Sequence, residues 1–499
     1  MTAVLAPAKR TLGERLIRPT LPELWTFLAV ALPVFAAIRA VLPTADLAFQ
    51  LRAGSEILAG RGTFSTDSWT FTTAGLAWLD QQWGAQVILA AVFSMSGWFG
   101  LAILRAALVG AISGLILWAV RVQAPSMRQR TAALLTLAAF AVTTPALALR
   151  PQLFGMWFFA IFLLVLVSRR KHARWLWALP LLSVAWANTH GSFILAPALI
   201  GLAWLEDLHE RSPRANRTLV AALASGAATL MTPFGIGAWK YALNLGVNRE
   251  VRTRVIEWQP PTLSDGPGIL FWTSVLLVAV ALLAVAWRRR SLPWPAVLGL
   301  ATFVGLGMLT VRGVAWWPGF AVVTLASFAI PLSRDGAARA GAHIRPGNRL
   351  NAVIASVLVL LSIAALPIWR PIDSGLDAPS GLLESAPSKV TSALRKIATP
   401  ADRVWNPQVW GSWLEFAVPA PSYAFDSRIE LIPSAVWADG DVVITAGAGW
   451  QEILDTAGAT IVIAEGAPTA PLARALALSP EWTSTHTDAD GSVWIRTDR

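Results

Sequence analysis

The residues of this sequence that could do chemistry are carboxylates and arginines in polar stretches between long apolar runs. Residues 44–84 contain Asp46, Asp80 and Arg52. A carboxylate at such a place can take the proton of a hydroxyl group, and an arginine can hold a phosphate through paired hydrogen bonds. This combination suits group transfer from a phosphate-linked molecule to a hydroxyl acceptor.

Four further candidates stand at the ends of apolar runs or in breaks between them, namely Arg150, His190, Glu257 and Arg312. An unpaired charge at such a depth costs about 2.5–3.5 kcal/mol on insertion scales, so a charge kept there normally faces a cavity. Each residue also has a structural interpretation. Arg150 could reach the lipid headgroups, His190 could make polar contacts at a helix kink, and Glu257 could pair with Arg312.

The carboxylates have structural alternatives of the same kind. Asp46 directly follows the first apolar run, where it could act as a general base or cap a helix. Asp67 lies in "STDS", which indicates a turn, and Asp80 lies between Trp78 and Trp83, where it could belong to a site or cap an interfacial helix.

The composition identifies the elements that must position these residues. Of the 499 residues 55% are apolar and only 14% are charged, and the mean hydropathy is +0.56. These values are typical of a polytopic membrane protein and exclude a soluble cytosolic fold. A spanning helix needs about 20 apolar residues. About eleven candidate spans are predicted near 22–43, 97–120, 130–148, 151–168, 175–188, 191–205, 218–236, 268–287, 292–311, 314–332 and 351–369. Residues 85–95 read as a further helix that lies along the interface.

The charge is divided unevenly along the chain. Residues 1–370 carry 32 Lys and Arg against 13 Asp and Glu, whereas residues 371–499 carry 8 against 16. The basic residues gather in the loops on one side of the predicted spans, which places the N-terminus in the cytoplasm and residues 371–499 outside. Because this pattern follows membrane topology, the basic net charge of +11 does not indicate a nucleic-acid partner.

Residues 371–499 read as a separate soluble α/β domain after a membrane domain at 1–370. Strands are predicted at 402–407, 422–426 and 459–466, helices at 449–458 and 471–480, and a final hairpin around 488–491. A stretch of this length can bury a core of its own. Asp426 and Arg428 follow the second strand, where they could form a structural pair or contact the membrane site.

Other classes of chemistry have no motif in this sequence. There is no cysteine, so a thiolate nucleophile and a thiolate metal site are excluded. No Walker loop, Rossmann glycine fingerprint or HExxH motif is found. The five histidines are scattered along the chain, which argues against a metal cluster built on histidine.

Several blocks resemble bacterial multispanning proteins of the GT-C glycosyltransferase-like class, in an uncharacterised subgroup. The blocks occur in order and at plausible spacing over most of the chain. They are "TADLAFQLRAG" (44–54), "TFSTDSWTFTTAG" (63–75), "WLDQQWGAQVIL" (78–89), "WANTHGSF" (186–193), "TPFGIGAWKY" (232–241), "EWQPP" (257–261), "VWNPQVWGSWL" (404–414) and "FDSR" (425–428).

The resemblance implies transfer of a sugar from a polyprenyl-phosphate donor to an acceptor glycan, lipid or protein of the cell envelope, at the outer face of the bacterial plasma membrane. It implies a first-loop carboxylate as base, here Asp46 with Asp80 as the second carboxylate, and in some members a divalent metal such as Mg²⁺ or Mn²⁺. Arg52, Arg150 or Arg312 would steady the leaving phosphate.

The chain departs from its likely relatives at two positions. Gln50 stands where a histidine is usual, and Ser427 stands where a glycine is usual before Arg428. Gln50 cannot titrate near neutral pH. A non-catalytic assembly protein that kept the fold therefore stays open as an alternative, and so does a lipid or solute transporter. Against the transporter, the hydropathy shows no inverted repeat.

Overall fold

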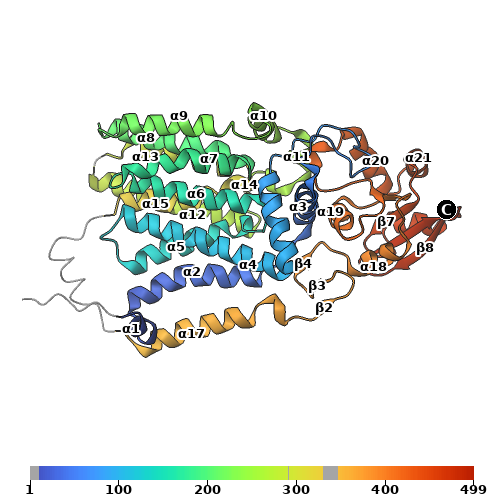
Figure 1. The fold of residues 1–499 in the computed structure, drawn as a ribbon, viewed down its shortest axis with the longest axis horizontal. Coiled ribbons are helices and arrows are strands. Elements are labelled where there is room, and N and C mark those ends of the chain that lie inside the picture. The colour runs from blue at the N-terminus through green and yellow to red at the C-terminus, as the bar shows by residue number, and fades with distance from the viewer. Residues whose placement is uncertain (1–10, 290, 330–346, 499) are drawn as a thin grey trace, which may run out of the picture.

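A computed structural model describes residues 11–289, 291–329 and 347–498 of the chain. Helices run along the long axis of the molecule, and the C-terminal sheet lies at one end of them (Figure 1). Within the described residues, five helices are long and apolar enough to cross a membrane. The predicted α-helical polytopic architecture with a C-terminal α/β part is therefore confirmed.

A helix lies in or overlaps each of the eleven ranges predicted to span. Five meet the length for crossing, namely α2 (Leu21–Arg39), α4 (Trp83–Gln123), α6 (Pro151–Ser168), η4 with α8 (Gly191–Ile194 and Leu195–His209) and α12 (Gly266–Arg289). The others are α5 (Gln129–Thr143), α7 (Leu179–Ala187) after η3 (Ala173–Ala178), α9 (Ala215–Ala228), α13 (Trp294–Leu309), α15 (Trp317–Ser327) and α17 (Arg349–Ala364). The number of eleven spans stays a prediction.

Short helices connect these elements. They are α1 (Leu12–Ile17), η2 (Thr144–Ala146), α10 (Ile236–Leu245), α11 (Arg249–Arg254), η5 (Ile256–Trp258), α14 (Val311–Val314) and η6 (Pro367–Trp369). The first long helix, α2, starts at a capping box in which Thr20 and Glu23 satisfy each other's backbone N–H groups. The 15 residues from Leu24 to Ile38 then carry no charged side chain before Arg39.

The long α4 joins two predicted elements, the interfacial helix at 85–95 and the span at 97–120. The two halves meet at Gly97, whose φ of +55° and ψ of −151° are non-helical. A glycine adopts this backbone conformation at little cost, whereas a side chain would strain it. Gly97 therefore allows the first half of α4 to take a different direction from the second half.

The first outer loop predicted at 44–84 begins with a helix, α3 (Thr44–Glu56), which passes into a π-helical turn, η1 (Ile57–Arg61). A short strand, β1 (Leu42–Pro43), precedes it. A Cβ atom on Gly54 would lie 2.1 Å from the carbonyl oxygen of Gln86, so α3 can approach α4 this closely only with a glycine there. This contact sets the position of α3, which carries Asp46, Gln50 and Arg52.

The C-terminal part contains a five-stranded sheet in the order β6-β5-β7-β9-β8. Its strands are β5 (Arg403–Trp405), β6 (Ser422–Tyr423), β7 (Ile461–Glu465), β8 (Trp482–Thr487) and β9 (Gly491–Arg496). Parallel pairs join β5 to β6 and β7, and antiparallel pairs join β9 to β7 and β8. The three predicted strands and the final hairpin are confirmed, and β7 is buried because its apolar residues pack on both faces.

Helices cover this sheet and connect its strands. They are α18 (Ser388–Ile397), α19 (Gln408–Ala417), η7 (Ile429–Leu431), α20 (Ser434–Ile444), α21 (Trp450–Thr456) and α22 (Pro471–Leu478). The helices predicted at 449–458 and 471–480 correspond to α21 and α22. The sequence analysis did not predict α18, α19 and α20. The predicted domain boundary after residue 370 stays a prediction.

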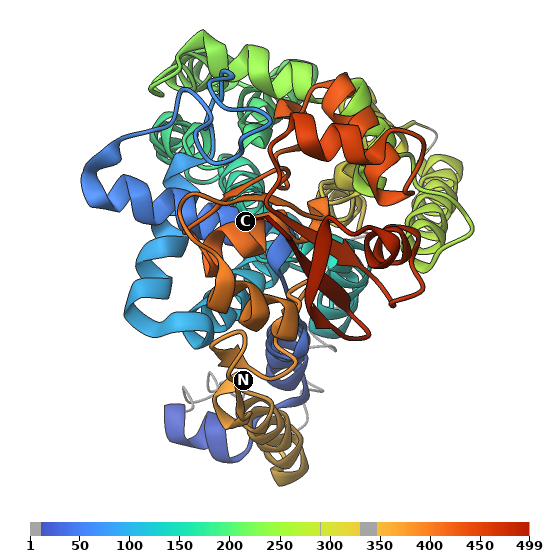
Figure 2. The ribbon, with the colours of Figure 1, turned by 90° about the vertical axis from the view of Figure 1, so that its right-hand side faces the viewer.

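The C-terminal part is joined to the first loop by backbone pairing. β1 pairs in parallel with β4 (Leu383–Glu384), and a parallel bridge joins Thr70 to Tyr423. A separate small sheet pairs β2 (Ile372–Asp373) with β3 (Ala378–Pro379). Seen from the end of the molecule that carries the sheet, residues 62–82 lie beside the C-terminal helices (Figure 2).

Candidate active site

A cavity of about 330 Å³ lies where α3, the start of α6, α10, η5, α14 and the C-terminal segment around η7 meet. Its lining brings together six of the nine residues predicted to form a site. These are Asp46, Arg150, His190, Glu257 and Arg312, with Arg428 from the C-terminal part. The structure thus collects side chains that lie up to several hundred residues apart in the chain.

A chain of ion pairs crosses this cavity. Arg150 Nε lies 3.1 Å from Asp46 Oδ2, and Arg150 Nη1 lies 2.7 Å from Glu257 Oε1. Arg312 Nε lies 2.9 Å from Glu257 Oε2. The four side chains keep 20–35% of their surface exposed, so they are accessible from the cavity. Two guanidinium groups and two carboxylates therefore face the same space.

Helix ends hold these side chains in place. Asp46 lies in the first turn of α3, where the helix dipole favours a negative charge. Arg150 is the N-cap residue of α6 and has an extended backbone, because the next residue, Pro151, disfavours a helical conformation before it. Burial alone would raise the pKa of Glu257, but Arg312 and Arg150 outweigh it, and the pKa of this carboxyl is lowered. Glu257 is therefore ionised at neutral pH.

His190 lies in the break between α7 and η4, as predicted. The backbone N–H of Ser192 donates to His190 Nδ1 over 3.1 Å, so Nδ1 is the acceptor and Nε2 carries the proton of the neutral ring. Burial, together with the charge of Arg312, lowers the pKa of His190 to about 3. At neutral pH the ring is an uncharged hydrogen-bond donor on the cavity wall.

The cavity contains polar residues that the sequence analysis missed. Tyr241 of α10 donates its hydroxyl hydrogen to Glu430 of η7 over 2.8 Å, and both line the cavity. Burial raises the pKa of Glu430. Gln50 donates to Gln82 over 2.8 Å on another wall. The presence of Glu430 in "FDSRIE", two residues after Arg428, was the only available signal for it.

Arg428 connects this cavity to a buried ionic cluster that we call the loop clamp, formed by Asp67, Asp426 and Arg428. Arg428 Nη2 lies 2.7 Å from Asp67 Oδ1 of the first loop, and the same guanidinium pairs with Asp426. The side chains are almost fully buried, and the guanidinium lies 4.4 Å from the ring centre of Trp78 and 4.6 Å from that of Trp69. Asp426 and Arg428 form a structural pair, and Arg428 also lines the cavity, while their role in a site stays a prediction.

Asp67 forms the turn that the sequence indicates. Its carboxylate accepts hydrogen bonds from the backbone N–H of Trp69 over 3.1 Å and from the hydroxyl of Thr70 over 2.6 Å. Burial acts to raise the pKa of Asp67, but Arg428 and these hydrogen bonds outweigh it and the pKa is lowered. The negative charge of Asp67 therefore balances Arg428.

Three predicted site residues are not in the lining of the cavity, namely Asp426 of the loop clamp, Arg52 and Asp80. Arg52 pairs with Glu56 at 3.2 Å and with buried Glu415 at 3.7 Å, and it stacks on Trp69 at 4.5 Å. These contacts place it beside the loop clamp instead of at the site, because it projects from the face of α3 that packs against α19.

Asp80 is buried, with 2% of its surface exposed. Its Oδ1 accepts a hydrogen bond from Gln86 over 2.6 Å, whereas Oδ2 has no hydrogen-bond partner among the described residues. Burial raises the pKa of Asp80 to about 7. Its predicted role as a second catalytic carboxylate stays a prediction, and the geometry places it behind the cavity wall.

Asp80→Asn is expected to remove a pH dependence of stability. The pKa of Asp80 is near 7 in the folded protein and near 3.8 in the unfolded chain. The contribution of its protonated form to the free energy of unfolding is therefore complete below about pH 4 and is lost as the pH rises through 7. The loss is on the order of 4 kcal/mol by pH 8. Thermal unfolding in detergent from pH 4 to 8 should therefore show that the variant becomes more stable than the wild type towards pH 8. Asp490→Asn, at an exposed position, is the control, and parallel curves for wild type and Asp80→Asn would contradict the assignment.

The cavity does not fit a resident divalent metal. Among the described residues no group of three or more His, Asp or Glu side chains has the arrangement of a metal site. The two carboxylates that face each other, Asp46 and Glu257, already share the guanidinium of Arg150. The positive charge between these two carboxylates therefore belongs to an arginine.

Two small apolar pockets lie between the helices. One, of about 10 Å³, is lined by Pro261, Val311, Val314 and Ala315. The second, of about 40 Å³, shares Ala315 and Thr143 with the first and lies between α4, α5, α6 and α15. Neither shares a lining residue with the charged cavity.

Comparisons with known proteins show a likeness in structure only. No family model matches the chain, and no curated protein matches it in sequence. The oligosaccharyltransferase of Archaeoglobus fulgidus is similar in its apo form, with a TM-score of 0.54 and 11% identity over 88% of this chain and 69% of that one. The same values are found for this archaeal enzyme, AglB, in complex with an inhibitory peptide and a dolichol-phosphate.

ArnT from Cupriavidus metallidurans bound to undecaprenyl phosphate is similar over 94% of this chain and 97% of that one, with 16% identity and a TM-score of 0.49. At these identities the likeness concerns the fold. Together with the apolar helices and the C-terminal sheet, the likeness to the oligosaccharyltransferase confirms the fold that the sequence blocks indicated. The chain is a membrane-embedded, polytopic protein with a GT-C-like fold.

Proposed function

We propose that this protein transfers a sugar from a polyprenyl-phosphate donor to an acceptor hydroxyl at the outer face of a bacterial plasma membrane. The observation that carries the proposal is the array of Arg150, Arg312, Asp46 and Glu257 in one cavity. Arginines suit a phosphate, and a carboxylate suits a hydroxyl proton. The similar oligosaccharyltransferase, solved in complex with a dolichol-phosphate, supports this class of donor.

The proposed reaction is a single inverting displacement. The acceptor hydroxyl gives its proton to Asp46 as its oxygen forms a bond to the anomeric carbon of the donor sugar. The bond from that carbon to the phosphate oxygen breaks at the same time, and the electron pair leaves with the polyprenyl phosphate. Charge develops on the phosphate oxygens, where preorganised donors stabilise it most strongly.

The arginines would change partners when the donor binds. In the free protein Arg150 and Arg312 both pair with Glu257, which keeps the two guanidinium groups in place. A donor phosphate between them would accept paired hydrogen bonds from both. Arg150 would then release Asp46, leaving that carboxylate able to accept a proton. The neutral His190 would donate Nε2–H to a sugar or phosphate oxygen.

A second candidate function is binding of a lipid phosphate without turnover. The observation that favours it is Gln50, which lines the cavity, hydrogen-bonds to Gln82 and cannot titrate. In this case the arginines would still bind the phosphate, but no transfer would follow.

The deciding experiment uses purified protein in lipid nanodiscs with a panel of polyprenyl-phosphate sugars and follows the release of free polyprenyl phosphate. Release supports the transferase, or hydrolysis of the donor when no acceptor is present. Saturable binding of a donor without release supports the non-catalytic alternative. If the protein neither binds nor consumes any lipid phosphate, both candidates are wrong and a transporter is favoured.

Removal of divalent metal is expected to leave the release of polyprenyl phosphate within about two-fold of its original rate. The reason is that the Arg150 guanidinium, and not a metal, lies between Asp46 and Glu257. The measurement compares initial rates in EDTA with rates in added Mg²⁺ or Mn²⁺. A rate in EDTA that falls ten-fold or more, and returns with Mg²⁺ or Mn²⁺, would contradict the assignment of Arg150.

A further inference from the structure

A second pocket, of about 100 Å³, lies in the C-terminal part at the carboxyl ends of three parallel strands. Trp405 ends β5, Phe425 follows β6, and Glu465 ends β7. Residues of α20 and α22 complete its wall. Since about 10–15 Å³ of such space holds one water molecule, the pocket has room for a group about the size of one sugar ring.

The pocket lies where the chain connections diverge. The chain leaves β5 through α19 for β6 on one side of the sheet, whereas it leaves β7 through α22 for β8 and β9 on the other side. The adjacent parallel strands β5 and β7 therefore flank a topological switch point. In open α/β sheets the crevice outside the carboxyl ends at such a point is the usual ligand site.

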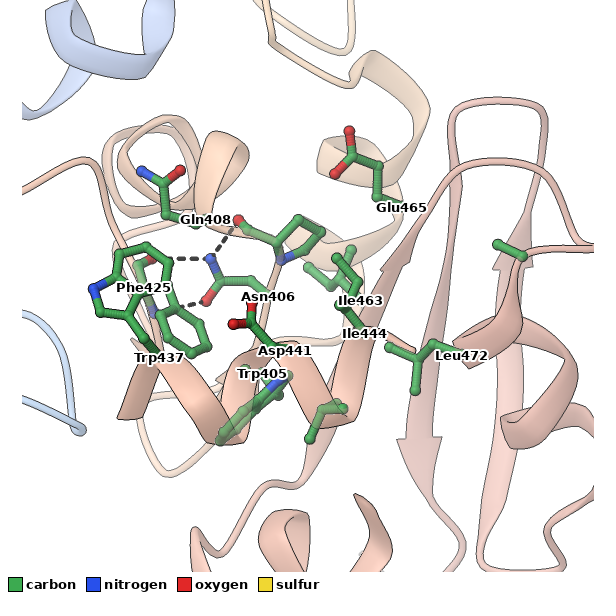
Figure 3. A pocket seen from close by; sticks show the side chains of 14 residues that line it. Trp405, Asn406, Gln408, Phe425, Trp437, Asp441, Ile444, Ile463, Glu465 and Leu472 are labelled. Atoms are coloured by element: carbon green, nitrogen blue, oxygen red, sulfur yellow. Dashed lines mark hydrogen bonds between the residues drawn. The ribbon is translucent and has the colours of Figure 1, made fainter. Parts of the chain in front are cut away.

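The lining combines aromatic rings with carboxylates. The rings of Trp405, Phe425 and Trp437 gather on one side, and Glu465 stands apart from them (Figure 3). The side chain of Glu465 is exposed and has no ion pair or hydrogen bond among the described residues, and partial desolvation raises its pKa. Trp437 is 7% exposed, and its Nε1 has no hydrogen-bond partner in the same part of the chain.

Of these two groups, Trp437 Nε1 is a buried donor without a partner in the described part of the chain, whereas Glu465 is open to solvent. Asn406, in contrast, uses both ends of its amide, donating to the carbonyl oxygens of Pro407 and Phe425 and accepting from the backbone N–H of Ala424. It fixes the loops after β5 and β6 and leaves the pocket preformed. A preformed pocket with aromatic side chains, one free N–H donor and one exposed, unpaired carboxylate matches a carbohydrate, whose C–H faces pack on rings and whose hydroxyls donate to carboxylates.

One thin wall separates this pocket from the main cavity. Gln408 lines both. Arg254 lines the main cavity, packs over the Trp437 ring at 4.3 Å and pairs at 2.8 Å with Asp441, which lines the pocket. A molecule that entered the pocket would therefore have its neighbouring part beside the main cavity.

We propose that this pocket binds one sugar ring of the acceptor, a carbohydrate whose next unit reaches the main cavity. That the bound sugar belongs to the acceptor rests on the function proposed above, whereas the binding of a sugar ring rests on the pocket alone. Glu465 accepts a hydrogen bond from a ring hydroxyl, and the rings of Trp405 and Trp437 pack against the sugar. The proposal assigns the acceptor class as glycan.

The test is binding of a panel of methyl glycosides to the full-length protein in nanodiscs, measured by saturation-transfer NMR. Glu465→Gln should weaken the binding of the preferred glycoside by about ten-fold, since the charged acceptor of the hydrogen bond is replaced by a neutral amide oxygen. Ala470→Phe, which fills the pocket, should abolish it. Glu481→Gln, at an exposed position outside the lining, should leave it unchanged.

A separate titration with polyprenyl phosphate in the same nanodiscs reports on the main cavity. Lipid phosphate that binds while no glycoside does would overturn the sugar site and leave the proposed function standing. Glycoside binding that Glu465→Gln and Ala470→Phe do not weaken would also overturn it. Glycoside binding that both variants weaken, in a protein that does not bind lipid phosphate, would support the sugar site and count against the proposed function.

Discussion

Asp46→Asn is expected to lower the rate of polyprenyl phosphate release by about 10²–10⁴-fold, the usual effect of losing a general base. Asn has nearly the same shape, so the packing of α3 should survive. It cannot take a proton from the acceptor, and it also frees Arg150 from its ion pair at 3.1 Å. Binding of the lipid phosphate should therefore stay the same or become tighter, while turnover falls.

The measurement is single-turnover release beside equilibrium binding of the donor, for the wild type, Asp46→Asn and Asp490→Asn. The last variant removes an exposed carboxylate in the C-terminal part and should behave as the wild type. A wild-type rate in Asp46→Asn would show that another group, with Glu257 or Glu430 as the nearest carboxylates in the cavity, takes the proton.

Arg428→Met is expected to destabilise the protein by about 3–5 kcal/mol, the usual cost of leaving a buried charge without its partner. Burial acts to lower the pKa of Arg428, but Asp426, Asp67 and Glu415 outweigh it and the pKa is raised. The positive charge is therefore permanent. Without it, Asp67 and Asp426 remain buried with like charges, although Met still fills the space between Trp69 and Trp78.

Chemical denaturation and limited proteolysis of the loop at residues 62–82 measure this effect, with Arg474→Met of α22 as an exposed control. The double variant Asp67→Asn with Arg428→Met should lose less stability than the sum of the two single variants, because the pair is removed together. Additive losses would mean that the Asp67–Arg428 contact does not hold the loop to the C-terminal part.

The elements of this protein follow from local patterns. Long apolar runs predicted the helix ranges, and the β-branched run at 459–466 predicted the buried strand β7. The helix α3 was missed because its polar residues Asp46, Gln50 and Arg52 interrupt the apolar pattern that marks a span. Similarly, α19 was missed because it starts directly after Pro407, in the block "VWNPQVWGSWL" whose first residues were predicted as a strand.

The site could be predicted only in part, because spans can be counted from the sequence but contacts between distant segments cannot. Charges at the ends of apolar runs identified Arg150, Glu257 and Arg312. In contrast, no local pattern shows that Arg52 turns towards Glu415, or that Asp80 lies behind Gln86. Glu430 was missed because its position depends on how the C-terminal part packs on α10 through Tyr241.

The contacts between the first loop and the C-terminal part also determine when the protein can mature. The hydroxyl of Thr72 binds the carbonyl oxygen of Ala424, 352 residues further along the chain. At usual rates of synthesis the loop would wait roughly 20–70 s for this partner. During that time the ring of Trp78 lacks the guanidinium of Arg428, and the ring of Trp69 has only that of Arg52. The cavity is consequently the last part of the molecule to be completed, and a chain that terminates early cannot carry a working site.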